Sequence, residues 1–118
     1  MKKMTLSDVK AYDAPGHFGV STMRLHGQDE TGGSKFWMGL SHFLPGGGCD
    51  LGVPPGEKVY YVLEGEITIK NKTEEHILRK NELIYIAPGE EREIINLSLI
   101  HISEPTRLKT RSRMPSSA

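Results

Sequence analysis

Several features that define large classes of protein are missing from this chain of 118 residues. Cys49 is its one cysteine, so no intrachain disulfide can form, which agrees with a reducing compartment. No apolar run is long enough to cross a membrane, and no apolar segment follows the first lysines as in a secretory signal. We therefore expect a cytoplasmic protein without a membrane partner.

The chain also lacks an excess of charge of either sign, with 15 Lys and Arg against 15 Asp and Glu. Residues 1–97 carry 11 basic and 14 acidic residues, a net of −3, whereas residues 98–118 carry four basic and one acidic, a net of +3. The body of the protein therefore has no basic face suited to nucleic acid. We interpret TRLKTRSR as a solvated basic stretch and predict no nucleic-acid partner.

Glycine and proline are plentiful, with 13 and 7 residues, whereas helical periodicity and internal repeats are absent. This composition favours short strands joined by turns, and the length suits a single core. Residues 1–35 are weakly patterned, and we expect them to supply strands and loops that lead into the core. We place the core over residues 36–103.

Strand patterns become clear from residue 36 onward. KFWMGLSHFL is rich in β-favouring residues, and we expect its strand to stop at the PGGG turn. KVYYVLEGEITIKN predicts a strand, a turn and a second strand, and EEHILRKNELIYIAPGEEREIIN predicts three more, with turns at Lys80-Asn81 and Pro88-Gly89. The predicted fold class is all-β, either a sandwich or a jelly-roll barrel of short antiparallel strands with protected edges.

Two of these segments resemble the cupin family, whose members are small β-barrels with a central site. YYVLEGEITI and LRKNELIYIAPGEEREIIN carry the resemblance, which spans about residues 36–96. The first family motif is Gly, five residues, His-x-His, three or four residues, Glu, six residues, Gly. The second is Gly, five residues, Pro-x-Gly, two residues, His, three residues, Asn. The resemblance implies a cupin-type jelly-roll barrel and, because such barrels commonly pair through their sheets, a homodimer.

The family's metal ligands are replaced in both motifs. With the first motif anchored on Gly65, Lys58 takes the place of the glutamate, and the two histidine positions fall within residues 51–54, which hold no histidine. With the second motif anchored on Gly89 and Asn96, Arg92 takes the place of the histidine. An ammonium and a guanidinium have no lone pair for a cation. We expect no metal cofactor at the usual position; a relocated site is the alternative, for example Glu57 with His42 and Cys49.

Strand alternation predicts a cavity that contains two cations. If Lys58 faces inward, Tyr60 shares its face, and by the same parity Arg92 faces inward from the opposing strand. Buried charges are costly unless they are paired, so these cations need a carboxylate or an anionic ligand. Two alternatives need no ligand. The cationic side chains could form ion pairs with Glu57, Glu66 or Glu93, or they could extend to the barrel mouth and keep their charged ends in water.

His42 completes the set of candidates. Alternation places it with Leu40 and Leu44, on the face that we expect to point inward. In a packed core it would be a satisfied histidine, whereas in a cavity it could orient a substrate or act as a general base. The candidate ligand-binding residues are therefore His42, Lys58, Tyr60 and Arg92.

These residues predict a cupin-like protein that binds a small anionic molecule, a carboxylate or a phosphate. The alternative is a cupin-type enzyme, an isomerase, lyase or dioxygenase that acts on a small carboxylate. Lys58 and Arg92 would then hold the carboxylate or stabilise an enolate-like charge while His42 or Tyr60 moves a proton. A third alternative is a degenerate barrel with a filled interior that serves as an interaction module.

Residues 104–118 differ in composition from the rest of the chain. They are built from basic, Ser, Thr and Pro residues without strand alternation, and we expect a disordered tail after a boundary near Ser103. SLIHISEPTR is similar to an ending that recurs on unrelated proteins from sequencing projects, which indicates a read-through or assembly artefact. The alternative is a basic tail that binds a partner.

Overall fold

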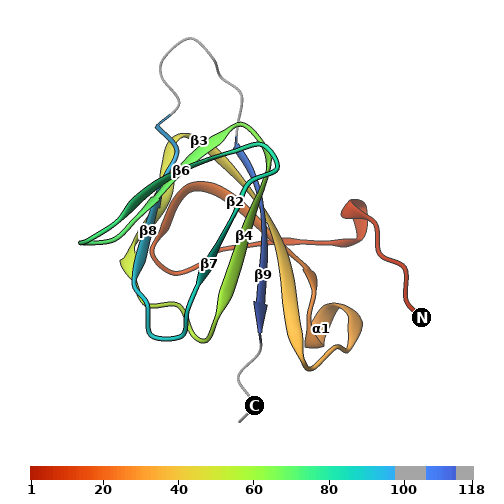
Figure 1. The fold of residues 1–118 in the computed structure, drawn as a ribbon. Helices are drawn as coiled ribbons and strands as arrows, with labels where there is room; N and C mark the ends of the chain where they lie inside the picture. Colours follow the sequence, from red (N-terminus) through yellow and green to blue (C-terminus); the bar gives the residue numbers. More distant parts are fainter. Residues whose placement is uncertain (98–105, 114–118) are drawn as a thin grey trace.

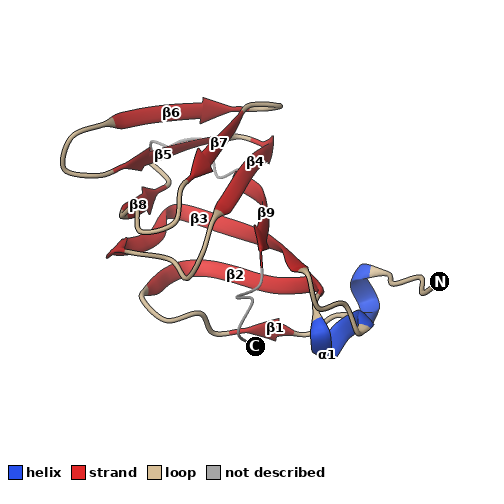
Figure 2. Cartoon of the chain, turned by 60° about the horizontal axis from the view of Figure 1, so that its bottom comes forward, coloured by secondary structure: helices blue, strands red, loops and turns tan. Residues whose placement is uncertain are grey.

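The computed structural model describes residues 1–97 with their side chains and the backbone of residues 106–113. Within these ranges, nine antiparallel strands form one sheet that curls into a barrel (Figures 1 and 2). The sheet order is β6-β5-β8-β3-β9-β4-β7, and β2 joins it on β3 and β1 on β2. The strands are β1 (Ala11–Tyr12), β2 (His17–His26), β3 (Phe36–Gly52), β4 (Lys58–Glu64), β5 (Glu66–Lys70), β6 (Glu75–Arg79), β7 (Leu83–Ile86), β8 (Arg92–Ile95) and β9 (Thr106–Arg113). The all-β class predicted from the sequence is confirmed.

Helical structure in the described residues is limited to two single turns near the N-terminus. A 3-10 turn spans Leu6–Asp8, and α1 spans Gln28–Thr31 in the connection between β2 and β3. Neither turn has the length or the apolar character of a membrane span.

Alternating apolar residues hold the barrel together. On β4, Tyr60 and Val62 are buried while their neighbours are half-exposed, and on β8 Arg92 and Ile94 are buried in the same way. This is the period of two that a strand with one covered face requires. The core cluster consists of Phe43, Cys49, Tyr60, Val62, Ile67, Ile69, Leu78, Ile86 and Ile94. The expected turns at Lys80-Asn81 and Pro88-Gly89 lie between β6 and β7 and between β7 and β8.

The strand expected to stop at PGGG instead continues. β3 runs through residues 45–48 as far as Gly52. Its pairing with β2 shifts between Phe18 and Val20, which marks a bulge. Gly46 has a φ of +79°, a conformation that glycine adopts without a steric penalty. The glycines therefore bend the strand rather than end it.

Asn96, the asparagine used to anchor the second motif, supports this bend. Its side chain is fully buried, and its amide nitrogen donates to the carbonyl oxygens of Phe43 at 3.0 Å and Leu44 at 3.3 Å. The backbone nitrogen of Gly46 donates to the Asn96 carbonyl at 2.8 Å. Carbonyls that the irregular strand would leave buried without a partner are thus satisfied.

Residues 106–113 also differ from the expectation of a disordered tail over residues 104–118. They form β9, which pairs with β3 on one side and β4 on the other. Without β9, the facing edges of β3 and β4 would have unpaired backbone groups. Backbone pairing on two sides does not require the side-chain alternation that this segment lacks, which is why composition was a poor guide. The rest of the predicted tail lies outside the described residues.

Candidate functional site

A cavity of about 560 Å³ lies among β2, β3, β4 and β8. Three of the four residues predicted to bind a ligand line it, namely Lys58, Tyr60 and Arg92. Lys58 and Tyr60 occupy alternate positions of β4, and Arg92 begins β8, opposite Gly52 of β3. The parity argument from the sequence therefore places these three side chains correctly, because each strand has one face toward the interior.

Arg92 is held by two hydrogen bonds. Its side chain is buried, with 6% of the residue exposed. Its Nε donates to the Tyr60 hydroxyl at 2.9 Å, and its Nη1 donates to the carbonyl of Gly52 at 3.4 Å. A guanidinium has five N–H groups, so this arrangement fixes its orientation while other donors remain for a ligand.

Lys58 lies among aromatic rings in the same cavity. Its ammonium nitrogen is 4.9 Å from the centroid of the Trp37 ring and 6.0 Å from that of Tyr60. Burial, followed by the positive charge of Arg92, lowers the pKa of Lys58 from 10.5 to about 8. Cation–π contacts favour the charged form but do not neutralise it. Near neutral pH the positive charge of Lys58 therefore shares the cavity with the Arg92 guanidinium.

Other titratable groups of the cavity respond to the same environment. Burial raises the pKa of the Tyr60 phenol, although Arg92 acts in the opposite direction. Burial also lowers the pKa of His17, and Arg92 and Lys58 lower it further. Burial raises the pKa of the Cys49 thiol. The phenol, the imidazole and the thiol are thus kept neutral, and the net charge of these side chains comes from the cations.

A third cation, Arg24, lines the cavity from β2. Its guanidinium carbon lies 5.1 Å from the centroid of the Tyr12 ring and 5.3 Å from that of Trp37. Its Nε is buried and has no hydrogen-bond partner within the described residues. Trp37 therefore has a cationic side chain near its ring from both β2 and β4.

The carboxylates that were the alternative partners of these cations bind elsewhere. Glu66 lies 3.2 Å from Arg79, and Glu93 lies 3.9 Å from Lys70. Glu57 accepts a hydrogen bond of 2.8 Å from the Tyr85 hydroxyl. Of the carboxylates in residues 1–97, Asp50 lines the cavity, and none forms an ion pair with Lys58 or Arg92.

His42 does not belong to the cavity. The cavity is lined by the alternate residues of β3, among them Trp37, Ser41 and Phe43, so His42 lies on the other face of the strand. Both faces of β3 are covered, since Leu40 is 4% exposed and Phe43 is 1% exposed. An apolar neighbour therefore could not identify the face that lines the cavity, and the structure does not bring His42 together with Lys58, Tyr60 and Arg92.

A metal centre of the kind found in the family motifs does not fit this site. Each motif has a cation at one ligand position, Lys58 or Arg92, and the two histidine positions of the first motif fall within residues 51–54, which hold no metal-binding side chain. The relocated set does not assemble, because His42 and Glu57 lie outside the cavity that Cys49 lines. In the part of the chain that the structure describes, no three side chains of His, Cys, Asp and Glu come close enough to hold a metal ion.

Sequence reasoning missed several polar or aromatic residues of the cavity, among them His17, Arg24, Trp37 and Asp50. His17 and Arg24 belong to β2, in the region that the sequence left weakly patterned. Their place in the cavity depends on long-range strand pairing, because β2 pairs with β3 along most of its length and His17 lies opposite Cys49. Trp37 belongs to β3, and the alternation of side chains along this strand in the structure shows that it faces the cavity.

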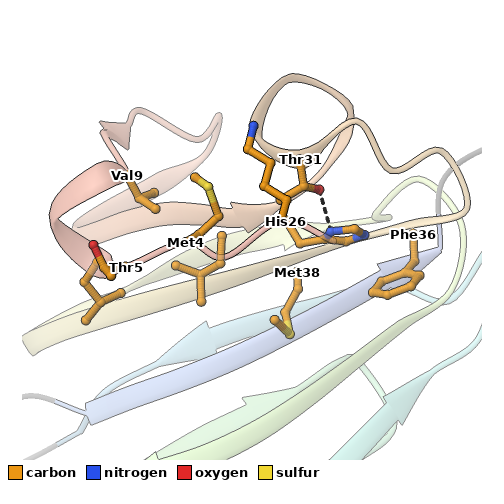
Figure 3. Close-up of a pocket in the computed structure, with 10 residues that line it drawn as sticks. Met4, Thr5, Val9, His26, Thr31, Phe36 and Met38 are labelled. Atoms are coloured by element: carbon orange, nitrogen blue, oxygen red, sulfur yellow. Dashed lines mark hydrogen bonds between the residues drawn. The ribbon is translucent and has the colours of Figure 1, made fainter.

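A second hollow, of about 550 Å³, lies on the outer face of β2 and β3 beneath the N-terminal segment (Figure 3). Met38 and Phe36 of β3 line it with Met4 and other apolar residues. Its polar contact joins the Thr31 hydroxyl to His26 Nδ1 at 2.6 Å, and the His26 ring packs on Phe36 with centroids 4.5 Å apart. The two hollows are similar in size, but the cavity inside the barrel is the one with several cations and shifted pKa values.

Comparison with known proteins identifies the family. A family model described as the cupin domain matches residues 39–101, which is more than half of the chain. The chain belongs to the cupin family. The match covers the strands that carry Lys58, Tyr60 and Arg92, whereas β2, which also lines the cavity, lies before the matched residues.

Proteins that are similar to this cupin have names that state different activities. A beta-D-galactosidase of Mycobacterium tuberculosis is 36% identical over 111 residues, which cover 89% of this chain and 96% of the relative. Among solved structures, the polyketide cyclase RemF from Streptomyces resistomycificus superimposes with a TM-score of 0.80 at 21% identity, covering 98% of this chain and 80% of that one. An RmlC-like cupin from Shewanella frigidimarina gives 0.75 at 13% identity, with 96% and 90% covered. These structures confirm the jelly-roll barrel.

Proposed function

We propose that this cupin binds a small anionic molecule, a carboxylate or a phosphate, in the barrel cavity and without a metal at the usual position. The observation that carries the proposal is the pair of cations, Lys58 and Arg92, which line one cavity without an ion-pair partner among residues 1–97. Arg24 adds a third positive charge to the same wall.

The energetics favour an anion over other ligands. Desolvated like charges in one cavity destabilise the ligand-free protein, and an anion that pairs with them removes part of that cost on binding. Arg92 is already oriented by Tyr60 and the carbonyl of Gly52, so little conformational entropy is lost when its free donors bind a planar carboxylate. A volume of about 560 Å³ lies within the range of small-molecule sites.

The test is a thermal shift series with acetate, malate and phosphate, compared with uncharged amides of the same acids. A ligand at a hundred times its Kd stabilises the folded state by about 2.7 kcal/mol, which raises the Tm of a domain of this size by several degrees. We expect the acids and phosphate to raise the Tm and the amides to have no effect. The shift should shrink in Lys58→Met and Arg92→Gln and persist in the surface control Lys80→Met. Equal shifts in all three variants would refute the proposal.

A second candidate function is hydrolysis of β-D-galactosides, and similarity favours it, because the 36% identical relative is named a beta-D-galactosidase. Hydrolysis by paired carboxylates requires two acids about 5 to 10 Å apart. Asp50 is the carboxylate that lines the cavity within residues 1–97, so a catalytic partner would have to come from another group. Release of nitrophenol from a nitrophenyl β-D-galactoside, with Asp50→Asn as the control, tests this candidate. Turnover that Asp50→Asn abolishes would favour it over simple anion binding.

We also propose that the protein is a cytoplasmic homodimer without nucleic-acid or membrane partners. The dimer is proposed because cupin barrels commonly pair through their sheets. The cytoplasmic location is proposed because the single cysteine is buried and free, which agrees with a reducing compartment. Light scattering coupled to gel filtration decides the dimer: a mass of one chain across the micromolar range would contradict it.

A further inference from the structure

Lys58 has a position that anion binding alone does not require. Its ammonium group lies against Trp37 rather than against a carboxylate, and it shares the cavity with a second, fixed cation. Because its pKa is lowered from 10.5 to about 8, the side chain has a larger neutral fraction near physiological pH than an ordinary lysine, although the ammonium form still predominates. A buried lysine in such surroundings is nucleophilic, whereas a surface lysine is almost fully protonated.

We propose that Lys58 forms a reversible Schiff base with a small 2-oxo acid whose carboxylate is held by Arg92. The proposal rests on the anion site proposed above and adds a covalent step to it. A 2-oxo acid fits because its carbonyl carbon is adjacent to its carboxylate, so that one bound molecule can present an anion to Arg92 and an electrophile to Lys58. Tyr60 is a neighbour of both, since its hydroxyl accepts a hydrogen bond from Arg92 and its ring centroid is 6.0 Å from the Lys58 ammonium nitrogen.

The chemistry balances without a further reactant. The neutral amine of Lys58 adds to the carbonyl carbon, and a proton moves from nitrogen to oxygen to give a carbinolamine. Loss of the hydroxyl as water then leaves the carbon–nitrogen double bond, and addition of water reverses the sequence. No electrons are gained or lost overall.

Tyr60 is suited to assist the loss of water. Its oxygen accepts a hydrogen bond from Arg92 Nε at 2.9 Å, which leaves its own proton available for donation. Because burial raises its pKa, the phenol keeps that proton at neutral pH and can pass it to the departing hydroxyl. Arg92 stays charged throughout, so it holds the carboxylate in both the free and the bound state.

The experiment is reductive trapping of the full chain with pyruvate and cyanoborohydride, followed by intact mass and peptide mapping. Lactate, which has the carboxylate but no carbonyl, serves as the matched ligand. Lys58→Arg keeps the cation and removes the amine. Lys80, which is exposed and lies 3.6 Å from Glu64, and the other lysines serve as controls within the same chain.

We expect one adduct per chain, on Lys58, that lactate suppresses and that is absent in Lys58→Arg. Adducts spread evenly over the lysines, or no adduct although lactate raises the Tm, would overturn the Schiff base and leave the anion site standing. If neither lactate nor pyruvate raises the Tm and no adduct forms, the anion site itself fails, and the covalent step fails with it.

Discussion

Replacing Lys58 by methionine should stabilise the ligand-free protein, although it removes a residue of the proposed site. The pKa of Lys58 falls from 10.5 to about 8 in the folded state, and a difference of about 2.5 corresponds to about 3 kcal/mol against folding. Contact with Trp37 offsets about 1 kcal/mol of this cost when the ion is desolvated. Methionine is similar in length and apolar, so we expect a gain of about 2 kcal/mol at pH 7.

The sign of the pH dependence follows from linkage. Well below pH 8 the side chain is protonated in both states, and nearly its full cost is present. Between about 8 and 10.5 the unfolded state binds more protons than the folded state, so the wild type gains stability as the pH rises. The advantage of the methionine variant should therefore disappear towards pH 10.5.

Urea unfolding at several pH values measures this directly. The control is Lys80→Met, because Lys80 is exposed and 3.6 Å from Glu64, so its replacement should change the unfolding free energy by less than about 0.5 kcal/mol. The reasoning fails if Lys58→Met is less stable than the wild type at pH 7. It also fails if the difference between the two is the same at every pH.

Three further predictions concern Tyr60, β9 and metal content. Tyr60→Phe leaves the buried Arg92 Nε without its acceptor and should cost about 1 to 3 kcal/mol in urea unfolding; a cost below about 0.5 kcal/mol would show that water replaces the phenol. Deletion of residues 104–118 removes β9 from between β3 and β4 and should abolish cooperative thermal unfolding, whereas a midpoint within about 1 kcal/mol of the full chain would show that the strand is dispensable. Elemental analysis of protein purified without chelator should find no stoichiometric transition metal, because cations occupy ligand positions of both motifs; one metal per chain would reveal a site that the described residues do not show.

The alternation of residues along individual strands was enough to predict part of the site. Alternation along β4 and β8 was enough to bring Lys58, Tyr60 and Arg92 to one interior, because the period of two holds wherever one face of a strand is covered. The motif spacing likewise identified the barrel, since the turns between these strands are short and each has its own turn residues.

What the sequence could not provide depends on contacts between distant segments. β3 is covered on both faces, so Leu40 and Phe43 are both buried and the apolar pattern does not reveal that His42 points away from the cavity. Strand continuity through PGGG depends on Asn96, some 50 residues later, whose amide binds the carbonyls of Phe43 and Leu44. β9 is a strand because two edges are available to it, a property of the sheet rather than of residues 106–113.

Isothermal titration calorimetry with a small carboxylate such as malate tests the central claim, that the cavity is an anion site built by Lys58 and Arg92. The account predicts saturable binding at one molecule per chain near pH 7. It also predicts at least about tenfold weaker binding in Lys58→Met and in Arg92→Gln, since each loses a charge-assisted contact worth 1.5 kcal/mol or more, on the order of tenfold in affinity. Affinity should fall as the pH rises past the pKa of Lys58, near 8. Binding of equal strength in the wild type and both variants, or no binding to the wild type, would contradict it.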